Sequence, residues 1–455
     1  MAKNFYKIIL LLSISYCQSI PAQFHIYRNE ISKISRGLNW EDHTLFGPIR
    51  LQSVNKKDSL ATHDYNLLGF QGFLKNGDVI NKSLYFNGIA KNYHNFYGYL
   101  FFRIVDDINM YHDFSGVRQE RSRLGFESGE TDNAGIGYQN DWLMVQIGRG
   151  RHSWSYDNDI NIFLNNLSKP YDSFSFGVNA SSVRIKYFTG FLENINEVNR
   201  YIVGKGMELT NKKNFFMNLS EVVIYSGLNR PFDFSYLNPV ASHLEIEKNN
   251  KQNMPGGKYG NAIWQLSIDW MYKKLFRFSG NFIIDELILD KEEIIEKNKD
   301  NGLGLSFKFS YLPDKINDLL VYFSYIGVGT HTYRHELGTN NFINKNSPLG
   351  WIHGSDGFEY NFGVRYNNLK NVDFELILGN RTLGENNILE YSYSKYEGYQ
   401  KTSFPSGILA KNSFIKFNYF YYFKKIGYFL SLENNYLDSS FEQAVVVGFD
   451  YRISY

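Results

Sequence analysis

Residues 444–455 read AVVVGFDYRISY, and this stretch predicts the fold of the chain. Apolar side chains stand at every second position, namely Val445, Val447, Phe449, Tyr451, Ile453 and Tyr455. Because successive side chains of a β-strand point to opposite faces, one face is wholly apolar and the other mostly small or charged. A soluble sheet can show this pattern too. The final aromatic, Tyr455, favours an outer-membrane β-barrel, in which the last strand pairs with the first and leaves no edge in lipid.

The same alternation recurs along the chain, for example over residues 173–180, 303–311 and 358–366. Segments of this kind number about 17, close to the ~16–18 strands of a medium-sized barrel. The period of two predicts which side chains face lipid and which face inward. The predicted lipid-facing residues are Phe174, Val183, Leu305, Phe362 and Phe449, and the predicted inward residues are Ser175, Arg184, Ser306, Asn361 and Asp450. We therefore predict an all-β, antiparallel transmembrane barrel of about 16–18 strands over residues 61–455.

The connections between these segments have two lengths. Short ones stand at 366–371 and 424–426. Long polar ones lie near residues 106–118, 245–260, 290–301, 328–355 and 394–411. This division is typical of barrels with tight periplasmic turns and long extracellular loops.

Residues 1–22 have the order of a secretory signal peptide. Two lysines precede the apolar run 8–12, and a short polar stretch ends at Ala22. The alternative, an N-terminal membrane anchor, needs a longer apolar run to cross a bilayer core of roughly 30 Å. Residues 23–60 lack a clear strand pattern, and we expect a small helical or periplasmic element there. The one cysteine, Cys17, lies in the signal, so we expect a mature chain without disulfides or thiolate metals.

Composition supports this class of protein. Removing Lys3 and Lys7 with the signal leaves 46 basic and 46 acidic residues, so charge gives no reason to expect a nucleic-acid partner. Aromatic residues make up 17% of the chain although its mean hydropathy is −0.37. Many aromatics in a polar chain suit a lipid-facing band around a wet interior. Beyond the signal no stretch approaches ~18 uninterrupted apolar residues, which argues against helical membrane spans.

Four segments, in this order and spacing, resemble the capsule assembly Wzi family of outer-membrane barrels. They are VQIGRGRHSW at 145–154 with LNNLSKP at 164–170, MEL at 207–209 with NLSE at 218–221, residues 225–239 ending in YLNP, and LGWIHGSDG at 349–357. The resemblance implies an outer-membrane, lectin-like protein that holds capsular or extracellular polysaccharide at the cell surface, without known catalysis. It implies outer-membrane lipid and the barrel-assembly machinery as further partners, and no cofactor.

The positions that carry the resemblance include groups suited to sugars. Arginine forks match the carboxylates of acidic polysaccharides, and a tryptophan face can stack on a sugar ring. We expect one polysaccharide-contacting region lined by Arg149, Arg151, Trp154 and Arg230, with Glu208 and Glu221 as orienting partners. The alternative is purely structural: Arg149 and Arg151 pair with Glu208, Glu221 or Asp285 across the lumen.

Glu221 has an unusual position in its strand. It shares its phase with Leu219 and Val223, which are expected to face lipid. A charged group in lipid costs roughly 2 kcal/mol or more near the midplane. Either a bulge shifts the register or this face looks inward, and both readings predict Glu221 in the lumen, paired with an arginine.

Two other functions are open to a barrel of this size. It could be a diffusion channel, although the bulky inward candidates Phe188, Phe420 and Phe429 favour a plugged lumen. It could also be a hydrolase, for which His152-Ser153 is the one hint of a nucleophile and its base.

Metal chemistry has little support in the sequence. Residues 157–161 begin like a calcium loop but lack its glycine and its bidentate glutamate, so we interpret them as a solvated loop and expect no metal site.

Overall fold

The computed structural model describes most of the chain after residue 65. The described ranges are 66–75, 78–91, 96–108, 114–119, 125–140, 142–249, 251–252, 260–288, 291–313, 316, 318–368, 371–396, 398–423, 426–437 and 440–453. The predictions for the signal at 1–22 and for the segment 23–60 lie outside them. Within these ranges, no helix is long and apolar enough to cross a membrane.

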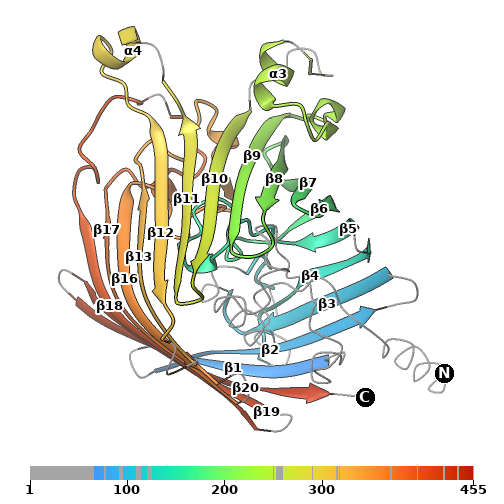
Figure 1. The fold of residues 1–455 in the computed structure, drawn as a ribbon, viewed down its shortest axis with the longest axis vertical. Coiled ribbons are helices and arrows are strands. Elements are labelled where there is room, and N and C mark those ends of the chain that lie inside the picture. The colour runs from blue at the N-terminus through green and yellow to red at the C-terminus, as the bar shows by residue number, and fades with distance from the viewer. Residues whose placement is uncertain are drawn as a thin grey trace.

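Eighteen antiparallel strands form one continuous sheet (Figure 1). They are β1 (Asn66–Lys75), β2 (Asp78–Lys91), β3 (Phe96–Val105), β4 (Ser128–Gln139), β5 (Leu143–Gly150), β6 (Tyr171–Ala180), β7 (Val183–Ile195), β8 (Val198–Thr210), β9 (Phe215–Leu228), β10 (Asn261–Tyr272), β11 (Phe276–Glu286), β12 (Gly302–Tyr311), β13 (Leu319–Val328), β16 (Gly357–Asn367), β17 (Val372–Leu383), β18 (Ala410–Phe423), β19 (Ile426–Leu437) and β20 (Ser440–Ile453). Strand β1 pairs with β2 on one side and with β20 on the other, placing Leu68 opposite Tyr451. The predicted barrel and its closure by the last strand are confirmed.

The side chains alternate between the two faces as the period of two predicts. Phe174, Leu305, Phe362 and Phe449 are between 38% and 49% exposed on the outside. Ser175 and Ser306, one position away from Phe174 and Leu305, are 2% and 0% exposed. An apolar outer face around a closed barrel is the architecture of outer-membrane proteins, and this chain is accordingly an outer-membrane barrel.

The long connections meet at one rim because consecutive strands run in opposite directions. They follow β3, β5, β9, β11, β13 and β17. Two of them carry the helices α3 (His243–Lys248) and α4 (Lys291–Ile295), which stand at this rim in Figure 1. The opposite rim has short connections, such as the two residues between β18 and β19. The predicted division into short turns and long loops is confirmed, and the rim with the long loops is the extracellular one in barrels of this class.

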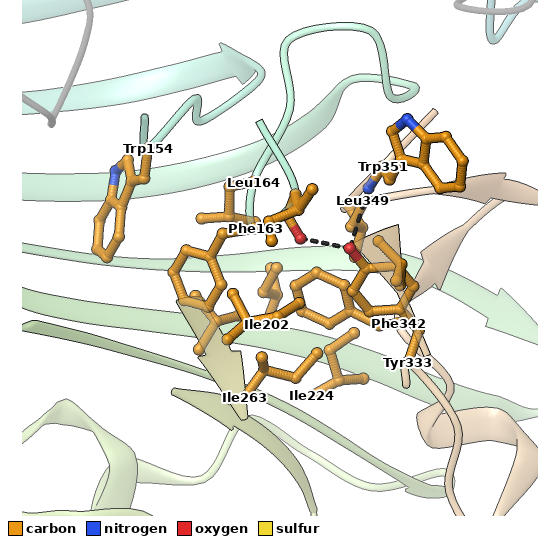
Figure 2. Packing of buried hydrophobic residues seen from close by; sticks show 14 of the residues in the cluster. Trp154, Phe163, Leu164, Ile202, Ile224, Ile263, Tyr333, Phe342, Leu349 and Trp351 are labelled. Atoms are coloured by element: carbon orange, nitrogen blue, oxygen red, sulfur yellow. Dashed lines mark hydrogen bonds between the residues drawn. The ribbon is translucent and has the colours of Figure 1, made fainter. Parts of the chain in front are cut away.

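Two long connections pack together into a buried core against inward-facing strand residues. We call residues 151–170 and 329–356 the lumen plug; they include η6 (Asn158–Ile160), η8 (Gly338–Asn340) and the hairpin β14 (Ile343–Asn344) and β15 (Ser347–Pro348). Figure 2 shows how the Tyr333 hydroxyl joins the two connections, donating to the Ile162 carbonyl and accepting from the Trp351 N–H at 3.1 Å. Phe188 of β7 belongs to the same buried core. The other two bulky inward candidates, Phe420 and Phe429, are also buried, but they pack against each other in a separate cluster.

Candidate functional site

Arg149 lies on the outer face, at the extracellular end of β5. It is in phase with Ile147, which is 58% exposed on the outside. Its guanidinium makes a two-pronged pair with Asp172 of β6, with Nε–Oδ1 at 2.9 Å and Nη2–Oδ2 at 2.7 Å. The Arg149 and Asp172 side chains are 42% and 61% exposed. Because the pair is exposed, it contributes little to stability. The exposed Arg149 side chain is also accessible to a ligand.

Arg151 is buried inside the barrel with Asp132 of β4. Its Nη1 and Nη2 donate to the two Asp132 oxygens at 2.8 and 2.7 Å, and both side chains are 1% exposed. Arg103 of β3 also reaches Asp132, at 3.3 Å, and Glu130, at 2.7 Å. Both arginines do form ion pairs, but the partners differ from those of the structural alternative, which placed Glu208, Glu221 or Asp285 across the lumen: Arg151 pairs with Asp132 inside the barrel and Arg149 with Asp172 outside it. Asp285 accepts instead from the backbone N–H groups of the plug, at Tyr333 and Arg334.

Trp154 belongs to the lumen plug and is fully buried. Its ring meets Phe188 edge to face at a centroid distance of 5.2 Å. Its backbone N–H donates to the Leu164 carbonyl at 3.0 Å. A ring with no exposed face cannot stack on a sugar, so the expectation that Trp154 contacts polysaccharide is wrong for this conformation.

The two candidate orienting carboxylates lie on opposite faces of the wall. Glu208 of β8 is buried inside and accepts from Arg184 Nη1 of β7 at 2.8 Å. Glu221 of β9 lies on the outer face, and the register through β8, β9 and β10 is regular around it, without a bulge. The prediction that Glu221 lies in the lumen with an arginine is wrong. Its partners are Lys205 Nζ at 2.9 Å and His243 Nδ1 at 2.6 Å.

Arg230 follows β9 and also lies outside the barrel. Its guanidinium carbon stands 4.7 Å from the centroid of the Tyr225 ring, and Nη2 is 3.2 Å from Asp233 Oδ2. Arg230 is 5% exposed. The six candidate residues therefore do not line one polar region: Arg151, Trp154 and Glu208 are inside, while Arg149, Arg230 and Glu221 are outside. Arg149, Glu208 and Glu221 lie in strands, where the period of two applies, whereas the other three lie in connections, whose folding shows no such periodicity.

A cluster of accessible basic groups does stand at the extracellular rim. The tip of the β14–β15 hairpin is Lys345-Asn346, with φ of 51° and 61°, as a two-residue turn of the primed type requires. Lys169, two residues before β6, donates its Nζ to the Lys345 carbonyl at 2.9 Å. The Lys345 N–H donates to Glu193 of β7 at 2.9 Å. We call Arg149, Lys169 and Lys345 the basic rim.

The charges of the basic rim act on one another. Burial is the largest influence on Lys345 and lowers its pKa, and the Arg149 charge lowers it further, while Glu193 opposes both. Burial also lowers the pKa of Lys169, again opposed by Glu193. Both lysines are half-buried. Cations whose charges act on one another favour an anionic ligand, whose carboxylates would add to the neutralisation that Glu193 and Glu130 supply.

An aromatic ring stands beside the hairpin tip. The Tyr393 hydroxyl accepts from the Asn346 N–H at 3.1 Å and donates to Glu193 at 2.7 Å. Lys169, Lys345 and Tyr393 were missed in the sequence because they come from different connections. The residues INKNSP at 343–348, a two-residue turn between short extended pairs, were the one local signal.

The side chains of the suggested His152-Ser153 pair and of the loop at 157–161 have other partners than the sequence predicts. Ser153 Oγ donates to Asn158 at 2.9 Å, whereas His152 Nε2 lies 3.0 Å from Ser173 Oγ, so the suggested His152-Ser153 pair does not form. The loop at 157–161 is not simply solvated, because Asp157 and Asp159 both pair with Lys308 of β12. Among the described residues no group of three or more acidic, histidine or cysteine side chains could hold a metal ion.

Comparisons with known proteins place this fold among outer-membrane barrels. No protein-family model matches the chain, and the comparison with curated proteins finds no match. Among solved structures, the chain is similar to Wzi from Escherichia coli, described as an outer-membrane protein involved in group 1 capsule assembly and as a carbohydrate-binding β-barrel. The TM-score is 0.59 at 12% identity, over 85% of each chain.

Two further outer-membrane structures resemble the chain at a TM-score of 0.48. The OpdK protein of Pseudomonas aeruginosa is 9% identical over 86% of this chain and 99% of its own. A BenF-like porin from Pseudomonas fluorescens is 7% identical over 86% and 98%. At these identities the likenesses are ones of fold, and the fold is that of an outer-membrane β-barrel.

Proposed function

We propose that this barrel binds an acidic capsular or extracellular polysaccharide and retains it at the cell surface. The observation that carries the proposal is the basic rim. It presents three cationic side chains at the extracellular rim, and one of them, Lys345, stands on a hairpin that is held by Glu193 and Tyr393. Arginine and lysine side chains bind carboxylates through charge-assisted hydrogen bonds, and a fixed site loses less entropy on binding.

The lumen plug supports a surface-binding role over free diffusion. Aromatic and aliphatic side chains of the plug form one buried core with inward residues of β7 to β13. The likeness in fold to Wzi, whose description names carbohydrate binding, agrees with the same role. A diffusion channel is the competing function, and conductance in planar bilayers separates the two. Large, steady open currents from the purified barrel would contradict a purely binding role.

The test in cells compares cell-attached with shed polysaccharide in a strain that makes the barrel. The double variant Lys169→Glu/Lys345→Glu should release polysaccharide into the medium at a normal level of heat-modifiable barrel. Lys273→Glu is the matched control, since Lys273 is an exposed lysine at the opposite rim. Shedding that follows barrel abundance alone, or equal shedding by the control, would refute the proposal.

A further inference from the structure

The outer face of β9 exposes apolar side chains over a shorter length than the outer faces of strands across the barrel. An apolar band about 25 Å tall covers about 10 residues of a strand tilted by ~40°. On β20 the exposed outward apolar residues are Phe441, Val447, Phe449 and Tyr451, which together span close to that length. Among the outward apolar residues of β9, Phe215 and Leu219 are exposed, while Val223 and Tyr225 in the same phase are 0% exposed. Something covers the upper half of the band on β9.

The cover is the β9–β10 connection, which folds back against the outer wall. We call residues 230–248 the outer cap; it contains η7 (Phe234–Leu237) and α3, which Figure 1 shows beside the upper ends of β8 and β9. Tyr236 of the cap stacks on Tyr225 at a centroid distance of 4.4 Å. Tyr236 and Ile246 share one buried cluster with outward residues of β7 to β10.

The cap also covers charged groups on this wall and forms hydrogen bonds with them. Lys205 and Glu221 pair at 2.9 Å, and the cap adds His243, whose ring and backbone N–H both reach Glu221. The cap backbone at Ala241 accepts from Lys205. With the cap in place, Lys205 and Glu221 are 7% and 3% exposed. Without it, an ion pair would face lipid at a depth where charged groups are costly.

The exposed surface of the cap includes four large apolar side chains, beside exposed Asn238, Glu245 and Lys248. Phe234 and Val240 are 68% and 88% exposed, and Leu237 and Leu244 of the same segment are also exposed. Much of its backbone is bonded internally or to the wall: Tyr236 donates to Asp233, Val240 to Asn238, His243 to Glu221 and Ile246 to Ser242. A segment with satisfied amides and apolar side chains can lie in the boundary of a bilayer.

We propose that the outer cap is a membrane-contacting element, with Phe234, Leu237, Val240 and Leu244 inserted among the acyl chains of the outer leaflet. It restores the apolar band that β9 lacks above Leu219 and shields the Lys205–Glu221–His243 cluster from lipid. The partner is lipid rather than a second protein because the cap is continuous with the lipid-facing band of the same strands, which includes Leu219 and Leu266.

Site-directed fluorescence tests this proposal in the whole barrel. The only cysteine is Cys17, within the expected signal, so Val240→Cys gives one labelling site for an environment-sensitive dye. In phosphatidylcholine vesicles the dye should emit at shorter wavelength and lose intensity with doxyl-labelled lipid, and it should resist aqueous iodide. Leu305→Cys on the lipid-facing side of β12 should behave alike. Ile408 is 80% exposed in the β17–β18 connection, so a dye at Ile408→Cys should be quenched by iodide and not by doxyl-labelled lipid.

Each other outcome overturns the proposal. Quenching of the Val240→Cys dye by iodide, as at Ile408→Cys, would place the cap in water. Quenching by neither reagent, with disulfide-linked dimers, would place it against a second copy. A second variant tests the anchor: Glu221→Gln should shift the Val240→Cys dye from lipid quenching to iodide quenching. An unchanged dye in that variant would remove the ion cluster as the anchor of the cap.

Discussion

Arg151 and Asp132 form a two-pronged ion pair inside the barrel, with N–O distances of 2.7 and 2.8 Å and both side chains 1% exposed. The Arg151 Nε also donates to the Ser168 carbonyl within the lumen plug, so the pair with Asp132 ties the plug to β4. This pair explains why an arginine next to an accessible one, Arg149, has a different role.

Breaking this buried pair should destabilise the barrel. Arg151→Ala leaves Asp132 buried with its main partner removed, a change that costs about 3–5 kcal/mol. Arg149→Ala removes an exposed pair worth about 0–1 kcal/mol and is the matched control. The measurement is the urea midpoint of the heat-modifiable band. Equal midpoints for the two variants would contradict the structural role of Arg151.

The Tyr333 hydroxyl should hold the two halves of the lumen plug together. Tyr333→Phe keeps the ring but leaves the Ile162 carbonyl and the Trp351 N–H without this partner, at a cost of about 1–3 kcal/mol. Amide hydrogen exchange at Trp351 should become faster. Tyr393→Phe, which removes a hydroxyl at the hairpin tip, should leave exchange at Trp351 unchanged. No change in either variant would mean that the hydroxyl does not join the connections.

Polysaccharide binding should weaken at alkaline pH. Burial lowers the pKa of Lys169 and Lys345, so each ammonium loses its proton at a lower pH than an exposed lysine, whose pKa is about 10.4. Cationic attraction is therefore present at neutral pH and is lost as pH rises through the lowered pKa. A bound polyanion raises that pKa again by linkage.

The arginine variant provides the control for this pH dependence. Lys345→Arg stays charged throughout the range and should retain more binding at alkaline pH than the wild-type barrel. Binding of an acidic polysaccharide to the purified barrel, measured from pH 7 to about 10, gives the comparison. Parallel pH profiles for the two proteins would exclude Lys345 as the titrating contact.

Closure by β20 should be required for insertion. This strand pairs with β1 and with β19, so removal of residues 449–455 leaves unpaired amides on both neighbours, which lipid cannot satisfy. The truncated chain should accumulate in the periplasm or be degraded. A membrane-embedded, heat-modifiable band from the truncated chain would contradict this role. Recognition by the barrel-assembly machinery is a further expectation that the same strain can report.

The barrel could be predicted from the sequence because a strand repeats every two residues and each apolar face is visible locally. Phe449 and Leu305, for example, were assigned to the outer face from the period of two, and both are exposed there. The site could not be predicted in the same way, because Lys169 and Lys345 meet through two connections that are far apart in the chain. Glu221, a carboxylate among lipid-facing residues, was the one sequence anomaly at the position of a covering element on the outer wall. It shares its phase with Leu219, yet the sequence led to a lumen position for it, because the cap that covers it is formed by a long connection without a periodic pattern.

The most direct test of the central claim is the affinity of the purified barrel for an acidic polysaccharide at low and moderate salt. The wild-type barrel and Lys273→Glu should bind alike, with an affinity that falls as salt rises. Lys169→Glu/Lys345→Glu should bind about tenfold or more weakly, a loss of about 1.4 kcal/mol, while it keeps its heat-modifiable band. Undiminished binding by the folded double variant would contradict the account.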